Sequence, residues 1–287
     1  MVKDWIEARD GLRLHVREWP CQPAEGTILI VHGLGEHIGR YEHVAAFLNR
    51  RGWRVVGHDH RGHGRSGGGR GQLAKGDDLL VDLAGVIDTV RGETPGPLVL
   101  LGHSLGGLVA ARLVAGGLEQ PKPAWHREVE ALALSSPVLA SNMSFLQKAM
   151  LAVLEPLTPN LAVANGLKPA WLSRDPAVVA AYEADPRVHD RIAPRLARFV
   201  VDGGPAVLTL AAAWKTPTLL LWAGSDPVVD AKGSASFAAR APKSVVEAHC
   251  FPALFHEIFN EPEQAEVLSV LGAWLDKLRV SPTRSSP

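Results

Sequence analysis

The feature that most constrains the fold is a regular alternation between continuous apolar runs and segments with helical spacing. The apolar runs lie at residues 27–33, 53–59, 97–102, 129–135, 216–224 and 245–251. Runs of this length are typical of strands in a parallel sheet that is covered on both faces. Helical spacing lies between or after them, at residues 40–50, 77–91, 105–117, 234–241 and 262–278. The alternation predicts an α/β fold with a doubly wound, mostly parallel sheet, and the period of two at residues 12–16 predicts one further, half-buried strand.

The alternation stops over residues 138–210. Helical pieces in this stretch are divided by prolines, and no strand-like run is present; the prolines are Pro156, Pro159, Pro169, Pro176, Pro186, Pro194 and Pro205. We therefore expect a helical cap at 138–210, inserted into a core made of 1–137 and 211–280. The tail at 281–287 is polar and proline-containing, and we expect it to be disordered.

Composition and charge narrow the class of protein. Hydrophobic residues make up 46% and charged residues 21%, as in folded globular chains. The 30 basic residues equal the 30 acidic residues, so electrostatics gives no reason to expect nucleic acid as a partner. A small or neutral ligand fits this balance better.

Three further features bear on location and on metal binding. Cys21 and Cys250 are far apart in sequence and predict neither a disulfide framework nor a thiolate zinc site. Residues 1–19 mix charges throughout, without the apolar segment of a secretory signal. No stretch approaches the ~20 apolar residues of a membrane helix. The sequence therefore predicts a cytoplasmic protein.

The strongest chemical motif is Gly102-His103-Ser104-Leu105-Gly106, a G-x-S-x-G followed by another glycine. An apolar strand precedes it and a helix of small residues follows it, which is the context that a nucleophilic serine on a sharp strand–helix turn requires. Small neighbours allow the close approach of strand and helix. The N-terminus of the helix directs its partial positive charge at the serine. Ser104 is therefore the predicted nucleophile.

A serine hydroxyl needs a base to remove its proton. On this kind of sheet the order along the chain is serine, acid, histidine, and the four histidines after Ser104 are His126, His189, His249 and His256. His126 lies in a polar loop, His189 in the predicted cap and His249 in the last strand. His256 lies between the last strand and the last helix, so it is the predicted base.

The acid must orient the histidine and stabilise its charged form. Asp226 directly follows the strand at 216–224, at a position equivalent to that of Ser104. Asp230 is the alternative, but it lies where an acidic side chain commonly caps a helix. Asp202 falls in the predicted cap. Asp226 is therefore the predicted acid.

Backbone N–H groups should hold the oxyanion that forms in the reaction. One donor is expected from Leu105, directly after the nucleophile. The other is expected from Leu34, between two glycines in the loop after the strand at 27–33. The same glycines do not complete a G-x-G-x-x-G nucleotide motif, because Ile38 stands at the third glycine position.

A dense group of polar residues at 58–63 raises the question of a metal site. His58, Asp59, His60 and His63 carry metal-binding groups. Glycines surround them and no His-Glu-x-x-His helix frames them, so we favour a loop stabilised by hydrogen bonds of Asp59 and Arg61. No metal and no organic cofactor is expected.

Taken together, the motifs of this chain resemble those of the monoacylglycerol lipase and lysophospholipase branch of the α/β-hydrolases, which are serine aminopeptidase S33-type hydrolases. The segments that carry the resemblance are VHGLGEHIGRY (31–41), HDHRGHGRSGGGRG (58–71), LGHSLGG (101–107), AGSDPVVD (223–230) and HEIFNEPE (256–263). The resemblance implies an α/β-hydrolase fold with a mobile cap. It implies the same roles for Ser104, Asp226 and His256, with oxyanion donors at Leu34 and Leu105.

The expected activity is hydrolysis of a carboxylic ester through an acyl-enzyme, with a monoacylglycerol or similar single-chain ester as the substrate. The match fades over the cap, which sets substrate choice. A small-ester carboxylesterase, a polyester depolymerase and an acyltransferase on the same three residues are therefore alternatives, and a non-catalytic binding protein is a more distant one. The apolar segment 144–157 could pack on the core, line an acyl tunnel or make transient contact with a lipid surface.

Overall fold

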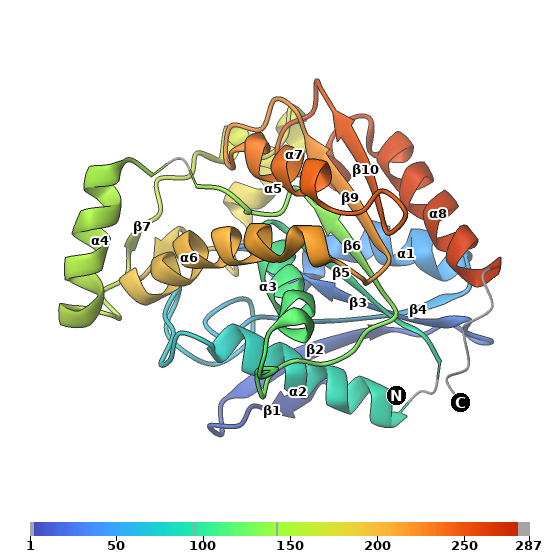
Figure 1. Cartoon of the computed structure of the whole chain (residues 1–287), viewed down its shortest axis with the longest axis horizontal. Helices are drawn as coiled ribbons and strands as arrows, with labels where there is room; N and C mark the ends of the chain where they lie inside the picture. Colours follow the sequence, from blue (N-terminus) through green and yellow to red (C-terminus); the bar gives the residue numbers. More distant parts are fainter. Residues whose placement is uncertain (1–2, 94–95, 142, 281–287) are drawn as a thin grey trace.

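The computed structural model describes residues 3–93, 96–141 and 143–280, so the predicted disordered tail at 281–287 lies outside the described residues. Its centre is an eight-stranded sheet in the order β1-β2-β4-β3-β5-β6-β9-β10 (Figure 1). The strands are β1 (Trp5–Glu7), β2 (Arg13–Trp19), β3 (Gly26–Val31), β4 (Trp53–His58), β5 (Leu98–His103), β6 (Ala131–Ser135), β9 (Thr218–Ala223) and β10 (Val246–Phe251). The predicted runs therefore match strands to within about two residues at each end.

Six neighbouring strands, from β4 to β10, pair in parallel, and β2 pairs antiparallel with both β1 and β4. The mostly parallel sheet is thus confirmed. The three-residue strand β1 has no counterpart among the predicted strands, because three residues are too few to display a period of two.

Helices cover both faces of the sheet. On β3, Ile28 and Ile30 pack into one core together with residues of α1 (Glu42–Arg50) and α8 (Gln264–Val280). Leu29 and Val31 face the other core, which includes residues of α2 (Asp78–Glu93), α3 (Ser104–Ala115) and α7 (Ala231–Arg240). Both faces of the central strands are therefore apolar, which explains why these strands read as continuous apolar runs.

Among the residues that the structure describes, the segment between β6 and β9 contributes no strand to the main sheet. Its helices are α4 (Phe145–Leu157), α5 (Pro176–Ala184) and α6 (Pro194–Leu210). Pro176 and Pro194 each occupy the first helical position, where a missing N–H costs nothing. The segment also holds a two-stranded ladder of β7 (Val163–Ala164) and β8 (Arg191–Ile192). The expectation that no strand lies here was wrong, because two-residue strands carry no recognisable pattern.

The residues Pro194–Ala213, which begin with α6, are long and apolar enough to cross a membrane by length and composition, with a mean hydropathy of 1.4. The expectation that no such stretch exists was therefore wrong, because the mean hydropathy of this helix stays high although charged residues such as Arg198 interrupt it. Helices that pack inside a folded domain meet the same criteria. Here one side of α6 packs on α3, where a Cβ on Gly203 would lie 3.2 Å from the Leu108 side chain, and 28% of its most apolar window is buried.

Candidate active site

Ser104 occupies the turn between β5 and α3. Its φ of +52° lies in the left-handed region, which is costly for a residue with a side chain. The turn is tight enough to demand glycine on both sides. A Cβ on Gly102 would lie 2.6 Å from the carbonyl oxygen of Gly106, and a Cβ on Gly106 would lie 2.0 Å from that of Val31. The motif thus forms the strained strand–helix turn that the sequence predicts.

Three of the predicted residues form one hydrogen-bonded chain. The Ser104 Oγ lies 2.8 Å from the His256 Nε2, and the His256 Nδ1 lies 2.7 Å from the Asp226 Oδ2. An ionised Asp226 can only accept, so the Nδ1–H donates to it and the Nε2 is left to accept from the Ser104 hydroxyl. The side chains of His256 and Asp226 are 3% and 1% exposed, so water does not compete for this bond.

The topology explains why these residues meet. Ser104 directly follows β5, Asp226 follows β9, and His256 lies in the loop after β10. The carboxyl ends of parallel strands share one edge of the sheet, so these three loops converge there. The second oxygen of Asp226 accepts from the backbone N–H groups of Val228 at 2.8 Å and Val229 at 3.0 Å, which fixes the carboxylate.

The rival residues of the sequence analysis have other partners. His126 bonds the Leu113 carbonyl, His249 pairs with Glu247, and His189 Nδ1 accepts from the N–H of Arg191. Asp230 caps α7 by accepting from the N–H of Lys232, as expected, and Asp202 pairs with Arg198. Among the residues that the structure describes, these five form no hydrogen bond with Ser104 or His256.

The loop after β3 lies against the serine. A Cβ on Gly33 would be 3.2 Å from the Ser104 Cβ. Within the described part of the chain, the N–H of the next residue, Leu34, donates to no acceptor. Leu105 is in the first turn of α3, where N–H groups have no partner within the helix. The two predicted oxyanion donors, Leu34 and Leu105, therefore line the same cavity as Ser104.

This cavity has a volume of about 530 Å³ and includes both Ser104 and His256 in its wall. Apolar side chains from the segment between β6 and β9 form much of the lining: Val138, Met143, Leu167, Trp171, Leu172, Ile192 and Val200. Polar groups of Glu36, His103 and Glu257 also face it. The cavity can thus hold an apolar chain while a carbonyl group contacts Ser104.

Sequence reasoning assigned no role to two features of this site. The His103 ring packs on the His256 ring, with centroids 4.9 Å apart. Burial and the neighbouring His256 lower the pKa of His103 to about 4, so this ring is neutral at pH 7. A buried ionic cluster of Glu36, Arg40 and Glu257 also adjoins the cavity. His103, Glu36, Arg40 and Glu257 all lie within segments that carry the family resemblance. The contacts that they make form only in the folded chain.

The polar residues at 58–63 form the hydrogen-bonded loop that the sequence favours. Asp59 accepts from the His15 side chain and from the backbone N–H groups of Ile38 and Arg65. Arg61 makes two hydrogen bonds to Asp82, at 2.6 and 2.7 Å. No group of three or more His, Cys, Asp or Glu side chains among the described residues is arranged to hold a metal ion.

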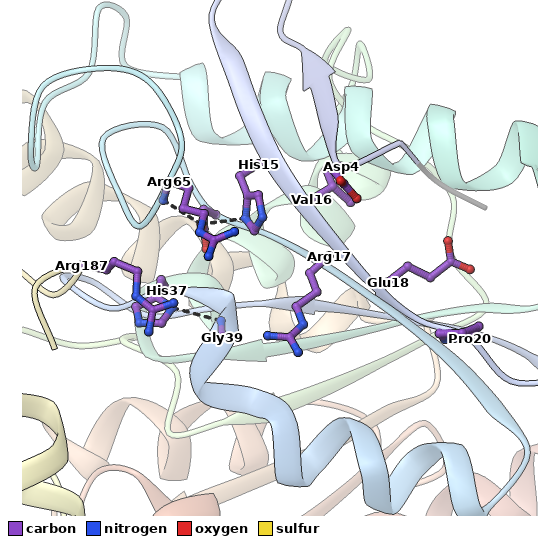
Figure 2. A pocket seen from close by; sticks show the side chains of 11 residues that line it. Asp4, His15, Val16, Arg17, Glu18, Pro20, His37, Gly39, Arg65 and Arg187 are labelled. Atoms are coloured by element: carbon purple, nitrogen blue, oxygen red, sulfur yellow. Dashed lines mark hydrogen bonds and ion pairs between the residues drawn. The ribbon is translucent and has the colours of Figure 1, made fainter.

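A second cavity, of about 310 Å³, lies between β2, the Gly39 turn and the Arg65 loop (Figure 2). It contains neither Ser104 nor His256. Most of its charged groups are already paired: Asp59 with His15, Arg187 with Asp185, and Arg17 with Glu42. The cavity that holds Ser104 is therefore the candidate active site.

Comparison with known proteins agrees with the fold and with the class of enzyme. Residues 22–263 match the family described as serine aminopeptidase, S33. A monoacylglycerol lipase of Mycolicibacterium smegmatis is 36% identical over 92% of this chain and 93% of its own. A phospholipase of Bacillus subtilis is 28% identical over 90% and 98%.

Solved structures agree as well. The crystal structure of a monoacylglycerol lipase from Paleococcus ferrophilus superposes with a TM-score of 0.81 and 33% identity, over 92% of this chain and 99% of that one. A monoglyceride lipase from Saccharomyces cerevisiae shares the fold, with a TM-score of 0.82 and 21% identity over 96% and 94% of the two chains. The chain therefore belongs to the serine aminopeptidase S33 family of α/β hydrolases, and it is an ester hydrolase of the lipase and esterase type.

Proposed function

We propose that the chain hydrolyses single-chain carboxylic esters, with a monoacylglycerol as the preferred substrate, and that Ser104, His256 and Asp226 carry the reaction. The observation behind this proposal is the continuous hydrogen-bonded chain from Ser104 to Asp226 at the wall of a largely apolar cavity. The names of the relatives, monoacylglycerol lipase and phospholipase, support a lipid ester as the substrate.

In the first half of the reaction, the Ser104 hydroxyl attacks the ester carbonyl while the His256 Nε2 takes its proton. The carbonyl oxygen becomes an oxyanion, which the N–H groups of Leu34 and Leu105 stabilise. Asp226 keeps the Nδ1–H of His256 in place and stabilises the imidazolium. His256 then protonates the leaving alcohol as the C–O bond breaks, and the acyl group stays on Ser104.

In the second half, water takes the place of the alcohol. His256 removes a proton from this water, which attacks the acyl-enzyme carbonyl and forms a second oxyanion at the same two N–H groups. Collapse of that intermediate returns the proton to Ser104 and releases the carboxylic acid. Each proton and electron pair in these reaction steps is supplied by substrate, water or the three side chains, so the chemistry needs no cofactor.

We also propose that the outer face of α4 makes transient contact with lipid surfaces. Leu146, Met150, Val153 and Leu157 recur at helical spacing and are 68%, 53%, 59% and 73% exposed. The buried side of the same helix is anchored through Leu151, and α4 lies at one end of the molecule, at the left in Figure 1. An exposed apolar stripe of this kind favours a hydrophobic partner. A cytoplasmic location stays a prediction.

The experiment that tests the proposed function is turnover of p-nitrophenyl esters of increasing chain length, followed by monoacylglycerols, with Ser104→Ala as the control. We expect medium and long chains to be preferred, monoacylglycerol to be accepted, and Ser104→Ala to be folded and inactive. Turnover of acetate and butyrate alone would move the substrate to small esters. Near-normal turnover by Ser104→Ala would overturn the assignment of the nucleophile.

A further inference from the structure

Arg40 connects two loops of the active site that are far apart in sequence. It lies in the short 3-10 helix η1 (Ile38–Tyr41), directly after the loop that holds Leu34. Its guanidinium donates to Glu36, four residues before it, and to Glu257, which lies 217 residues further along the chain. Glu257 is the residue after His256. A single side chain thus joins the loop of one predicted oxyanion donor to the loop of the predicted base.

On the oxyanion side, the link passes through the Glu36 carboxylate. Its Oε2 accepts from the Arg40 Nη1 at 2.8 Å, and its Oε1 accepts from the backbone N–H of Gly33 at 2.6 Å. The Tyr41 hydroxyl donates to the same Oε1 at 2.7 Å. The Gly33 N–H belongs to the His32–Gly33 peptide, so this bond fixes the backbone directly before the peptide that carries the Leu34 N–H.

On the base side, the link is a two-point contact. The Arg40 Nη1 and Nη2 lie 2.5 and 2.7 Å from the two carboxylate oxygens of Glu257. The N–H of Glu257 donates to the Leu172 carbonyl, and the Asn260 side chain donates to Glu257 Oε2. A planar guanidinium on both oxygens of a carboxylate fixes direction as well as distance.

The side chains of this cluster are largely buried, which restricts their movement and costs free energy of desolvation. The side chains of Arg40, Glu36 and Glu257 are 12%, 4% and 5% exposed, and they bring two negative charges and one positive charge out of water. Burial alone would raise the pKa of Glu36, but Arg40 and the nearby histidines outweigh it and lower that pKa to about 2. A buried ion cluster is generally no more stabilising than apolar packing of the same volume. Its distinctive property is the fixed geometry between its members.

We infer that Arg40 is a positioning residue that holds the Gly33–Leu34 loop in register with His256, an inference that rests on the proposed function. It touches neither Ser104 nor the reacting atoms. Its effect is on the distance between the Leu34 N–H and the oxyanion at the moment His256 accepts the proton. Since the oxyanion exists only along the reaction path, loss of this alignment lowers kcat and leaves ground-state binding nearly unchanged.

The test is Arg40→Lys in the full-length chain, assayed with one p-nitrophenyl ester and with a boronic acid that forms a tetrahedral adduct on the serine. Lysine keeps the charge but not the planar two-point contact. We expect kcat to fall by about 10- to 100-fold, as displacements near 1 Å commonly cause. We expect KM to stay within about twofold, and the boronic acid to bind more weakly by a factor similar to the loss of kcat.

The matched control is Arg61→Lys, which breaks another buried two-point contact, to Asp82, away from the cavity. We expect it to lower the melting temperature and leave kcat and KM unchanged. Glu257→Gln is a second, isosteric variant, and we expect it to lower kcat in the same direction as Arg40→Lys.

Two outcomes would overturn the inference. One is a folded Arg40→Lys variant with kcat within twofold of wild type, and the other is a loss that falls on KM alone. Either result leaves the proposed function intact as long as Ser104→Ala is inactive. Turnover by Ser104→Ala would instead remove the proposed function itself.

Discussion

His58, at the carboxyl end of β4, offers a sharp test of how burial controls stability in this chain. The residue is fully buried, and neither of its ring nitrogens has a hydrogen-bond partner among the described residues. Burial, assisted by the nearby His32, lowers its pKa from 6.5 to about 3 against the opposing effect of Asp59. At pH 7 the ring is therefore neutral in the folded chain and has unsatisfied polar atoms.

The pH dependence follows from the sign of this shift. A histidine whose folded pKa is depressed contributes its full stability above the unfolded pKa of 6.5, and that contribution is lost as pH falls toward about 3. Each unit of pH inside this window removes ~1.4 kcal/mol. Between pH 7.5 and pH 5.5, which reaches about one unit into the window, His58 alone should remove ~1.4 kcal/mol of the free energy of unfolding.

Two variants separate polarity from titration, and both are measured by urea unfolding at pH 7.5 and 5.5. His58→Leu removes both features, so we expect a gain of ~1–2 kcal/mol at pH 7.5 and a pH-dependent loss that is ~1.4 kcal/mol smaller than in wild type. His58→Gln keeps a buried polar group, so we expect the smaller loss without the gain. If the free energy of unfolding fell by the same amount between pH 7.5 and pH 5.5 in wild type and in both variants, this reasoning would be refuted.

Three further predictions concern the site, the turn and the cap. Asp226→Asn should lower kcat by about 10⁴-fold with an unchanged melting temperature, because an amide favours the wrong His256 tautomer, as in a serine protease triad; ester turnover within tenfold of wild type would count against the role of Asp226. Gly106→Ala should destabilise the chain by ~3 kcal/mol or more through its clash with Val31, whereas Gly85→Ala, in the open interior of α2, should stabilise it by ~0.5–1 kcal/mol; equal thermal shifts would contradict the turn geometry. Met150→Ser combined with Leu157→Ser should weaken sedimentation with phosphatidylcholine vesicles and leave hydrolysis of a soluble short-chain ester unchanged, and undiminished vesicle binding would remove α4 as the contact.

Local patterns predicted every strand of the main sheet except β1, and they singled out three residues that lie together at its edge. The apolar runs that form β3 and β5 are buried on both faces, so their composition alone marked them as central strands. Ser104, Asp226 and His256 each follow a strand of the parallel sheet, and a parallel sheet brings such positions to one edge. The order serine, acid, histidine along the chain then left few alternatives for the acid and the base.

Other features depend on contacts between distant residues, which no local pattern carries. The ladder of β7 and β8 is two residues long and has no period to detect. One partner of Arg40, Glu257, lies 217 residues away, so the sequence alone gives no sign of this contact. The exposed face of α4 has the same apolar spacing as a core helix, and only its exposed position distinguishes the two.

The most direct test of the central claim is covalent labelling of the intact protein with a fluorophosphonate, with the modified residue identified by peptide mass spectrometry. Fluorophosphonates react with serines that an adjacent base activates. We predict one adduct per chain, on Ser104, with ester turnover lost in proportion to labelling and neither labelling nor turnover in Ser104→Ala. An adduct on another residue, or full turnover in a protein that is completely labelled at Ser104, would contradict the account.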